Sequence, residues 1–303
     1  RRDVEAVRHL ANYVIARHYP EAADAANPYC ALLELVIARQ AELVAKWLLV
    51  GFIHGVMNTD NMSIASETIE YGPCAFMDAY DPAGVYSSID SLGRYAYGNQ
   101  PRIALWNLAR FAETLLPLLA EDQEPAIEMA NGALGAFAGR FEAAYATGLR
   151  RKLGLFQDHE GDFALAQDLL ERMARNGADF TLTFRRLADA QARTDGDAAV
   201  RSLFSDPSAF DDWGNRWRAR LACDGEATSE RRRTAMCAVN PAFIPRNHLV
   251  EEALSAAVNN GDLSAFETLL TVLLRPYGEQ PDRTRYADPP QPDQIVHQAF
   301  CGT

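Results

Sequence analysis

Apolar residues recur at helical spacing over the first fifty positions of the chain. From residue 4 to residue 18 they follow one another at steps of three and four, which predicts an amphipathic helix over 4–18. Asn27 and Pro28 then supply a cap residue and a first-turn proline, so a second, largely buried helix is predicted from Pro28 to Trp47.

The helical period stops between Gly51 and about Asn99. Short apolar runs at 62–66 and 74–80 alternate there with Gly, Pro, Asn and Asp, which predicts loops that carry short strands. A loop region of this length inside a compact domain is usually functional. This part of the chain is therefore the place to look for chemistry.

Helical periodicity returns at Pro101 and continues almost to the end of the chain. Helices are predicted over 101–120, 124–150, 162–176, 196–205, 207–222, 247–260 and 262–274. The Pro- and Asp-rich segment after Arg275 is predicted to lie extended over the surface. The predicted fold class is mainly α, with one short β/loop insertion near residues 50–98.

Composition excludes several classes of function. The 303 residues carry 29 Lys+Arg against 41 Asp+Glu, a net charge of −12, so we expect no nucleic-acid partner. The apolar run at 47–53 is far shorter than the roughly 20 residues that a membrane span needs, so we expect no membrane partner. Five scattered cysteines without a CxxC pair argue against disulfides and zinc, and favour a reducing, cytoplasmic compartment.

The string HGVMNTDN at 54–61 has the spacing of a protein-kinase catalytic loop. His54 stands seven residues before Asn61, as in H-R-D-L-x-x-x-N. Val56 occupies the position of the usual catalytic Asp and cannot accept a proton. Asp60 is the carboxylate within this loop, which makes it the candidate proton acceptor.

Glu70-Tyr71-Gly72 follows nine residues after Asn61, where a kinase has its metal-binding D-F-G. Asn61 and Glu70 together are the predicted ligands of a Mg²⁺ ion that otherwise keeps waters and phosphate oxygens. A structural interpretation fits the same residues. In it, His54 is a buried histidine with satisfied hydrogen bonds, Asp60-Asn61 forms a turn and Glu70 is a solvated charge.

Several longer strings carry a resemblance to a known family. They are VGFIHGVMNTDNMSI (50–64), EYGPCAFMDAYDP (70–82), GRYAYGNQPRIALWNLAR (93–110), NPAFIPRN (240–247) and the final CGT. In order and spacing the chain resembles the selenoprotein O (SelO) family of protein adenylyltransferases, over essentially all of its length.

The resemblance implies a protein-kinase-like C-terminal lobe in residues 1–120 and a helical extension with an extended tail in residues 121–303. It implies that AMP is transferred from ATP to Ser, Thr or Tyr hydroxyls of protein substrates, with Mg²⁺ or Mn²⁺ as cofactor, by a protein expected to be a monomer. By position, Asp60 matches the family's proton acceptor, Asn61 a metal ligand, and Glu70 the family's Asp that contacts both metal and ATP.

Three departures from the family pattern affect these expectations. The upstream lobe with the ATP-binding lysine is not in this chain, and neither Lys46 nor Lys152, its only two lysines, stands where that lysine would. Glu70 replaces the usual Asp and carries one more methylene. The family's loop cysteine corresponds to Tyr86, so no partner is expected for Cys301 and a redox switch there is not expected.

These departures leave other functions open. We expect the isolated chain to be incomplete, and inactive or weakly active as an adenylyltransferase. The alternative is a non-catalytic pseudokinase module that binds nucleotide or a protein partner. A small-molecule phosphotransferase ranks last, because it would need Asp at the position of Val56.

Two further features have a structural and a functional interpretation. The segment 213–221 interleaves two tryptophans with Arg216, Arg218 and Arg220, which suits a polyanion but is more typical of a helix face paired with carboxylates. Cys74 lies close to Glu70, but a small core residue is the favoured interpretation over a nucleophile.

Overall fold

A computed structural model describes residues 3–191, 196–225 and 228–300 of the chain. These residues are mainly helical, which confirms the predicted mainly α class. The division into 1–120 and 121–303 stays a prediction. In the described ranges, no helix is both long enough and apolar enough to cross a membrane.

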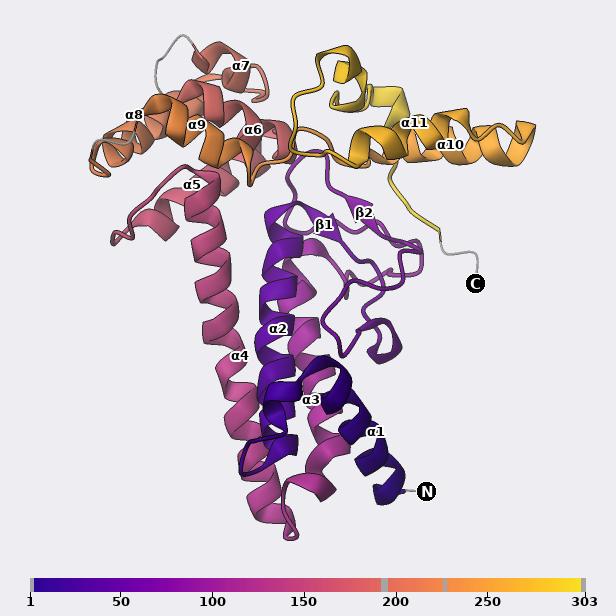
Figure 1. Ribbon diagram of the computed structural model, residues 1–303. Helices are drawn as coiled ribbons and strands as arrows, with labels where there is room; N and C mark the ends of the chain where they lie inside the picture. The colour runs from indigo at the N-terminus through magenta and orange to yellow at the C-terminus, as the bar shows by residue number, and fades with distance from the viewer. Residues whose placement is uncertain (1–2, 192–195, 226–227, 301–303) are drawn as a thin grey trace.

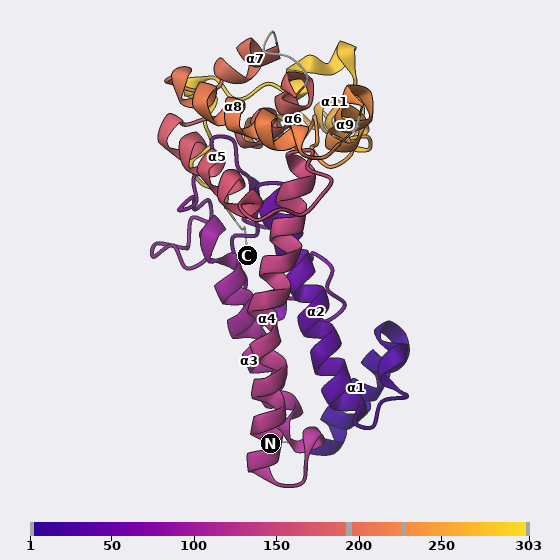
Figure 2. The ribbon, with the colours of Figure 1, turned by 90° about the vertical axis from the view of Figure 1, so that its left-hand side faces the viewer.

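Four helices form the elongated half of the molecule (Figure 1). They are α1 (Val4–His18), α2 (Pro28–Leu49), α3 (Gln100–Leu119) and α4 (Gln123–Lys152). Helix α2 packs along both α3 and α4, and the two views agree that these three run side by side (Figures 1 and 2). The predicted cap Asn27 accepts a hydrogen bond from Cys30 N, and Asp3 caps α1 in the same way by accepting one from Ala6 N.

Shorter helices gather at one end of this bundle (Figure 2). They are α5 (Asp162–Asn176), α6 (Phe180–Ala190), α7 (Asp197–Arg201), α8 (Ser208–Ala222), α9 (Ser229–Cys237), α10 (Asn247–Asn260) and α11 (Ser264–Leu273). The tail after Arg275, described as far as residue 300, is mostly exposed, so its predicted surface position is confirmed. It is not extended throughout, because it contains the short 3₁₀ helices η5 (Pro281–Tyr286) and η6 (Pro292–Gln294).

The sequence pattern missed helices α6 and α9. The first turns of α6 are buried on every side, including two threonines, so no polar face marks the helical period. Helix α9 was missed because its run of arginines leaves few apolar residues to mark a helical period. Predicted helix 196–205 is also shorter in the structure, where α7 ends at Arg201.

The insertion between α2 and α3 contains one two-stranded antiparallel sheet. Strand β1 (Phe52–Ile53) pairs with β2 (Ala75–Phe76), so Phe52 faces Phe76 and Ile53 faces Ala75. The strand predicted within 74–80 is present at its start. The one predicted at 62–66 is wrong, because Tyr19 and Gln40 bind the carbonyls of Ile64 and Ser63 and hold this segment as a turn.

Helix α8 shows that the arginine-rich segment is structural. Trp213 and Trp217 are fully buried, and their ring N–H groups donate to the carbonyls of Leu165 and Leu153 at 2.8 and 2.9 Å. The arginines between and after them pair with carboxylates: Arg216 with Asp168, Arg218 with Asp197, and Arg220 with Asp162 and Asp224. The carboxylate-paired interpretation is confirmed.

A buried arginine joins the C-terminal helices to the loop insertion. Arg246 is fully buried, and its Nη1 lies 2.7 Å from Asp78 Oδ1 and 2.6 Å from Asp179 Oδ2. Its Nη2 donates to the carbonyl of Ala287 at 2.8 Å. Next to it, Asn247 exchanges two hydrogen bonds with the backbone of Phe76, the second residue of β2. Asp179 also caps α6, so three segments meet at one charge cluster.

Replacing Arg246 by alanine tests this cluster. Arg246→Ala leaves two carboxylates in a buried place without their cation, so it is expected to lower the free energy of unfolding by about 3–5 kcal/mol. Arg285→Ala is the control, because Arg285 pairs with Glu252 at the exposed surface and should cost less than about 1 kcal/mol. Urea denaturation of both variants measures the difference, and equal costs would contradict the structural role of the cluster.

Candidate functional site

The candidate catalytic loop, residues 54–61, begins directly after β1 and is anchored by a buried histidine. The His54 ring is fully buried, and its Nε2 lies 3.0 Å from the carbonyl oxygen of Ile69. Burial lowers the pKa of His54, although the Ile69 carbonyl and the Glu70 carboxylate oppose that shift. A neutral ring at this place suits a structural anchor. The ring is buried as the structural interpretation expected, but its Nδ1 has no hydrogen-bond partner among the described residues, so the expected full set of hydrogen bonds is not present.

Asn61 is held in one orientation within the loop. It ends the short 3₁₀ helix η2 (Thr59–Asn61), and its side-chain Nδ2 donates to the carbonyl of Val56 at 3.0 Å. Because the amide nitrogen is engaged, the amide oxygen Oδ1 is left as the free acceptor of the side chain. Val56, which stands where a kinase has its catalytic Asp, thus orients Asn61 through its backbone carbonyl. Asp60 lies exposed on the same short helix.

Glu70 is the most unusual residue of the site. Its φ angle is +59°, in the left-handed region that side chains other than Gly rarely adopt. One carboxylate oxygen, Oε1, accepts a hydrogen bond from Gly72 N at 2.9 Å. The other, Oε2, is buried and has no hydrogen-bond partner among the described residues. A strained backbone and an unpaired buried carboxylate oxygen are typical of a ligand-binding site.

Two close approaches hold the loop against the segment that carries Glu70. The first is the contact of His54 with Ile69, the residue before Glu70. The second is at Gly55, whose φ is +84° and where an added Cβ would lie 2.5 Å from the carbonyl oxygen of Pro73. Only glycine fits this approach. The fold therefore brings the Asp60-Asn61 loop and the Glu70 loop together.

The donor set fits a hard cation only in part. An amide oxygen and a carboxylate oxygen are ligands that Mg²⁺ accepts, and Glu70 Oε2 has no competing partner. Within the described ranges, no group of three or more His, Cys, Asp or Glu side chains is arranged to hold a metal. Asn61 and Glu70 therefore offer ligand types that Mg²⁺ accepts, and a metal at this place would need further ligands from elsewhere.

Two polar residues of α3 brace the loop from behind and were not assigned from the sequence. Gln100 accepts a hydrogen bond from His54 N at 3.0 Å and donates to the carbonyl of Phe52 at 2.9 Å. Asn107 donates to the carbonyl of Met57 at 2.9 Å. Both lie at helical spacing with the buried Ile103 and Leu108. A polar residue on the apolar stripe of a helix is the signal that could have identified them.

Two other positions raised by the sequence are Cys74 and the loop at Tyr86. Burial raises the pKa of Cys74 to about 11, so its thiol is protonated and the interpretation as a small core residue holds. Ala299 exchanges backbone hydrogen bonds with Tyr86 and Ser88, so the tail reaches the loop at Tyr86. Cys301, for which no partner was expected, lies outside the described residues.

The two lysines lie in contrasting places. Lys46 is on the exposed face of α2. Lys152 ends α4 and is buried, with its Nζ 4.3 Å from the ring centre of Phe184 and 5.4 Å from that of Phe180. Burial lowers the pKa of Lys152 to about 7.

Comparison with known proteins shows the family of the chain. The family model described as "Protein adenylyltransferase SelO" matches residues 1–274. A "Protein nucleotidyltransferase YdiU" of Bradyrhizobium diazoefficiens is 63% identical over 303 residues, and one of Rhodopseudomonas palustris (strain BisB5) is 60% identical over 303 residues. A third, from Methylorubrum extorquens (strain PA1), is 62% identical over 309 residues. The chain belongs to the SelO family, which confirms the resemblance.

These alignments cover the chain and the relatives unequally. All three include 100% of this chain, but 61%, 61% and 62% of the relatives from B. diazoefficiens, R. palustris and M. extorquens. The chain thus spans about three fifths of the length of the curated relatives it matches.

The close approach at Gly55 can be tested by substitution. Gly55→Ala places a methyl group against Pro73 O and a side chain at a positive φ, so the free energy of unfolding should fall by about 2 kcal/mol or more. Gly132→Ala is the matched control in an exposed part of α4 with open space around it, and should raise stability by about 0.5–1 kcal/mol. Urea denaturation gives both values, and a harmless Gly55→Ala would refute the close approach.

The buried lysine predicts a pH dependence of stability. With a folded pKa of about 7, Lys152 is neutral in the folded chain at higher pH while it remains charged in the unfolded chain. The unfolded state then binds more protons, so the free energy of unfolding should rise with pH from about 7 to about 10. Lys152→Met removes the titrating amine and leaves the other ionisable groups of the chain unchanged. Parallel pH profiles of the two proteins in urea denaturation would contradict the prediction.

Proposed function

We propose that the chain forms the catalytic lobe of a magnesium-dependent protein adenylyltransferase. The observation that carries the proposal is that two loops in contact with each other carry three oxygen-bearing side chains. Asn61 has an oriented free amide oxygen, Glu70 has a buried carboxylate oxygen without a partner among the described residues, and the exposed Asp60 stands next to Asn61 in the sequence. Membership of the SelO family and the name nucleotidyltransferase of the relatives support the same reaction class.

The proposed fold assignment is a protein-kinase-like C-terminal lobe followed by a helical extension. Its support is the arrangement of the loop insertion between α2 and α3, with the catalytic loop, the Glu70 loop and the bracing helix α3 in that order. The relatives' additional length is where the proposal places the remaining groups that grip ATP.

In the proposed reaction, a protein hydroxyl attacks the α-phosphorus of ATP. The new bond joins the hydroxyl oxygen to phosphorus, the bond to the bridging oxygen breaks, and pyrophosphate leaves. Asp60 takes the hydroxyl proton, a role open to an exposed carboxylate that substrate can approach. Ser, Thr and Tyr of protein substrates are the proposed acceptors.

Asn61 Oδ1 and Glu70 Oε2 would hold Mg²⁺, and Mn²⁺ suits the same oxygen ligands. Mg²⁺ supplies charge neutralisation for the phosphate oxygens. The chain's own contribution is to hold those two ligands in fixed positions. Asn61 is fixed by Val56, and Glu70 by Gly72 and the left-handed backbone.

A pseudokinase module that binds nucleotide without chemistry is the second candidate. Val56 in place of a catalytic Asp and the longer, backbone-strained Glu70 favour it. The two candidates differ in group transfer, because both allow ATP to bind. Labels on different phosphates of ATP separate AMP transfer, phosphate transfer and the absence of transfer.

The test uses a full-length protein, in which the chain is completed with the remainder of the B. diazoefficiens relative. With ATP labelled at the α-phosphorus, label should enter protein hydroxyls, and Asp60→Asn, Asn61→Ala and Glu70→Gln should each lower the rate by about 100-fold or more. Glu70→Asp keeps the carboxylate and suits the left-handed backbone better, so it should retain transfer.

The matched control is Glu67→Gln, which removes an exposed carboxylate three residues before Glu70 and should leave the rate unchanged. Transfer undiminished by Asp60→Asn and Asn61→Ala would overturn the residue roles. Incorporation of the γ-label would overturn the reaction class. ATP binding without any transfer would favour the pseudokinase.

A further inference from the structure

An exposed patch of arginine and aromatic side chains borders the candidate catalytic loop. Trp106 is 43% exposed, whereas the other three tryptophans are buried. The Cζ of the exposed Arg94 lies 4.9 Å from the ring centre of Trp106 and 5.6 Å from that of Tyr95. Arg110 lies over the same Trp106 ring at 5.4 Å. These four residues form the Arg94 patch, and Trp, Tyr and Arg are the residue types that contribute most to binding at protein interfaces.

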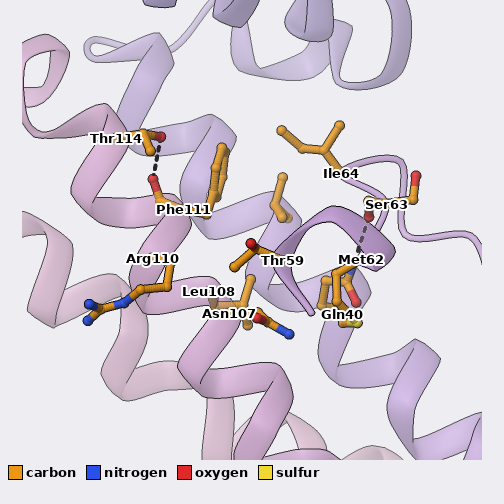
Figure 3. A pocket seen from close by; sticks show the side chains of 11 residues that line it. Gln40, Thr59, Met62, Ser63, Ile64, Asn107, Leu108, Arg110, Phe111 and Thr114 are labelled. Carbon is orange, nitrogen blue, oxygen red and sulfur yellow. Dashed lines mark hydrogen bonds between the residues drawn. The ribbon is translucent and has the colours of Figure 1, made fainter. Parts of the chain in front are cut away.

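The Arg94 patch meets the catalytic loop directly before Asp60. The hydroxyl of Tyr95 donates to Asn58 Oδ1 at 2.7 Å. Arg110 and Thr59 line the same cavity of about 290 Å³ between α3 and the loop (Figure 3). Asn58 and Thr59 are the two residues before Asp60, the proposed proton acceptor. A protein segment that brings a hydroxyl to Asp60 therefore has the Arg94 patch beside it.

The guanidinium of Arg94 has no carboxylate partner among the described residues. The carboxylate oxygens of Asp90 accept hydrogen bonds from the backbone N–H groups of Arg94 and Tyr95 instead, at 2.8 and 2.7 Å. Arg110 differs, because it pairs with Glu113 at 2.8 Å. Arg94 is thus held by two aromatic rings while its N–H groups stay open to solvent. A stacked guanidinium with open N–H groups is suited to a planar carboxylate.

We propose that the Arg94 patch selects protein substrates with an Asp or Glu close in sequence to the acceptor hydroxyl, through a bidentate pair between that carboxylate and Arg94. The proposal rests on the adenylyltransferase function proposed above and adds a substrate class to it. Arg94 determines specificity and takes no part in the transfer itself. The net charge of −12 disfavours an acidic segment over the surface in general, so an arginine without a carboxylate partner defines where such a segment binds.

A binding experiment on the 303-residue chain tests the patch without any group transfer. The probes are the peptides GEEYEEG and GQQYQQG, which have the same length and differ in charge. The indole N–H signal of Trp106, assigned with a Trp106→Phe variant, reports binding by NMR because this ring is exposed. The glutamate peptide should bind about tenfold more tightly than the glutamine peptide, since a carboxylate forms charge-assisted hydrogen bonds with Arg94.

Substitutions at Arg94 locate the binding site. Arg94→Gln should abolish the preference for the glutamate peptide. Arg94→Glu should reverse it, so that GKKYKKG binds more tightly than GEEYEEG, a result that loss of structure would not produce. Arg140→Gln is the matched control, because Arg140 is an exposed arginine in a separate groove between α2 and α4, and it should leave both affinities unchanged. The NMR signals of the buried tryptophans check that each variant is folded.

The same preference is expected in AMP transfer by the completed full-length protein. With ATP labelled at the α-phosphorus, kcat/KM for GEEYEEG should exceed that for GQQYQQG by about tenfold. Arg94→Gln should remove this difference by raising the KM for the glutamate peptide, while the KM for ATP stays the same.

Several results would overturn the proposal. They are the absence of a Trp106 shift with the glutamate peptide, equal affinity for the two peptides, and a preference that survives in folded Arg94→Gln. A raised KM for ATP in Arg94→Gln would also overturn it, because the arginine would then bind nucleotide phosphates. If the binding preference is present but no AMP is transferred, the acidic-segment site is supported and the proposed adenylyltransferase function is refuted, so the two failures are distinguishable.

Discussion

The buried ion cluster of Arg246 with Asp78 and Asp179 connects the parts of this molecule on which the site depends. A guanidinium without exposed surface requires carboxylates, because an unpaired buried charge costs several kcal/mol. Asp78 belongs to the loop insertion and Asp179 caps α6, so the cluster joins the C-terminal helices to the segment that carries Glu70. With Asn247 bound to Phe76, the short sheet is supported from outside by α10.

A second constraint acts from the other side of the loop. Helix α3 presents Gln100 and Asn107 to backbone groups on both sides of Gly55, and α2 presents Gln40 to Ser63. Irregular backbone inside a protein needs such partners, since its own N–H and C=O groups lack the regular pairing of a helix or sheet. The loop is thus shaped by side chains that are fixed on rigid helices.

Local signals in the sequence were enough to predict most of the helices. Asn27 acts as the cap that its position predicted, Asp3 caps α1 from the position just before it, and Gly261 ends α10. Interactions between distant residues were not predictable in this way. Arg246 and Asp78 are 168 positions apart, and Tyr19 reaches Ile64 across 45, so no local pattern could indicate the ion cluster or the turn that replaced a predicted strand.

Within the site, the sequence indicated residue types but not their environment. The strained backbone of Glu70 and its unpaired oxygen emerge only in three dimensions. An unpaired polar atom alone is weak evidence, because Arg246 Nε also lacks a partner inside a cluster that is otherwise well paired.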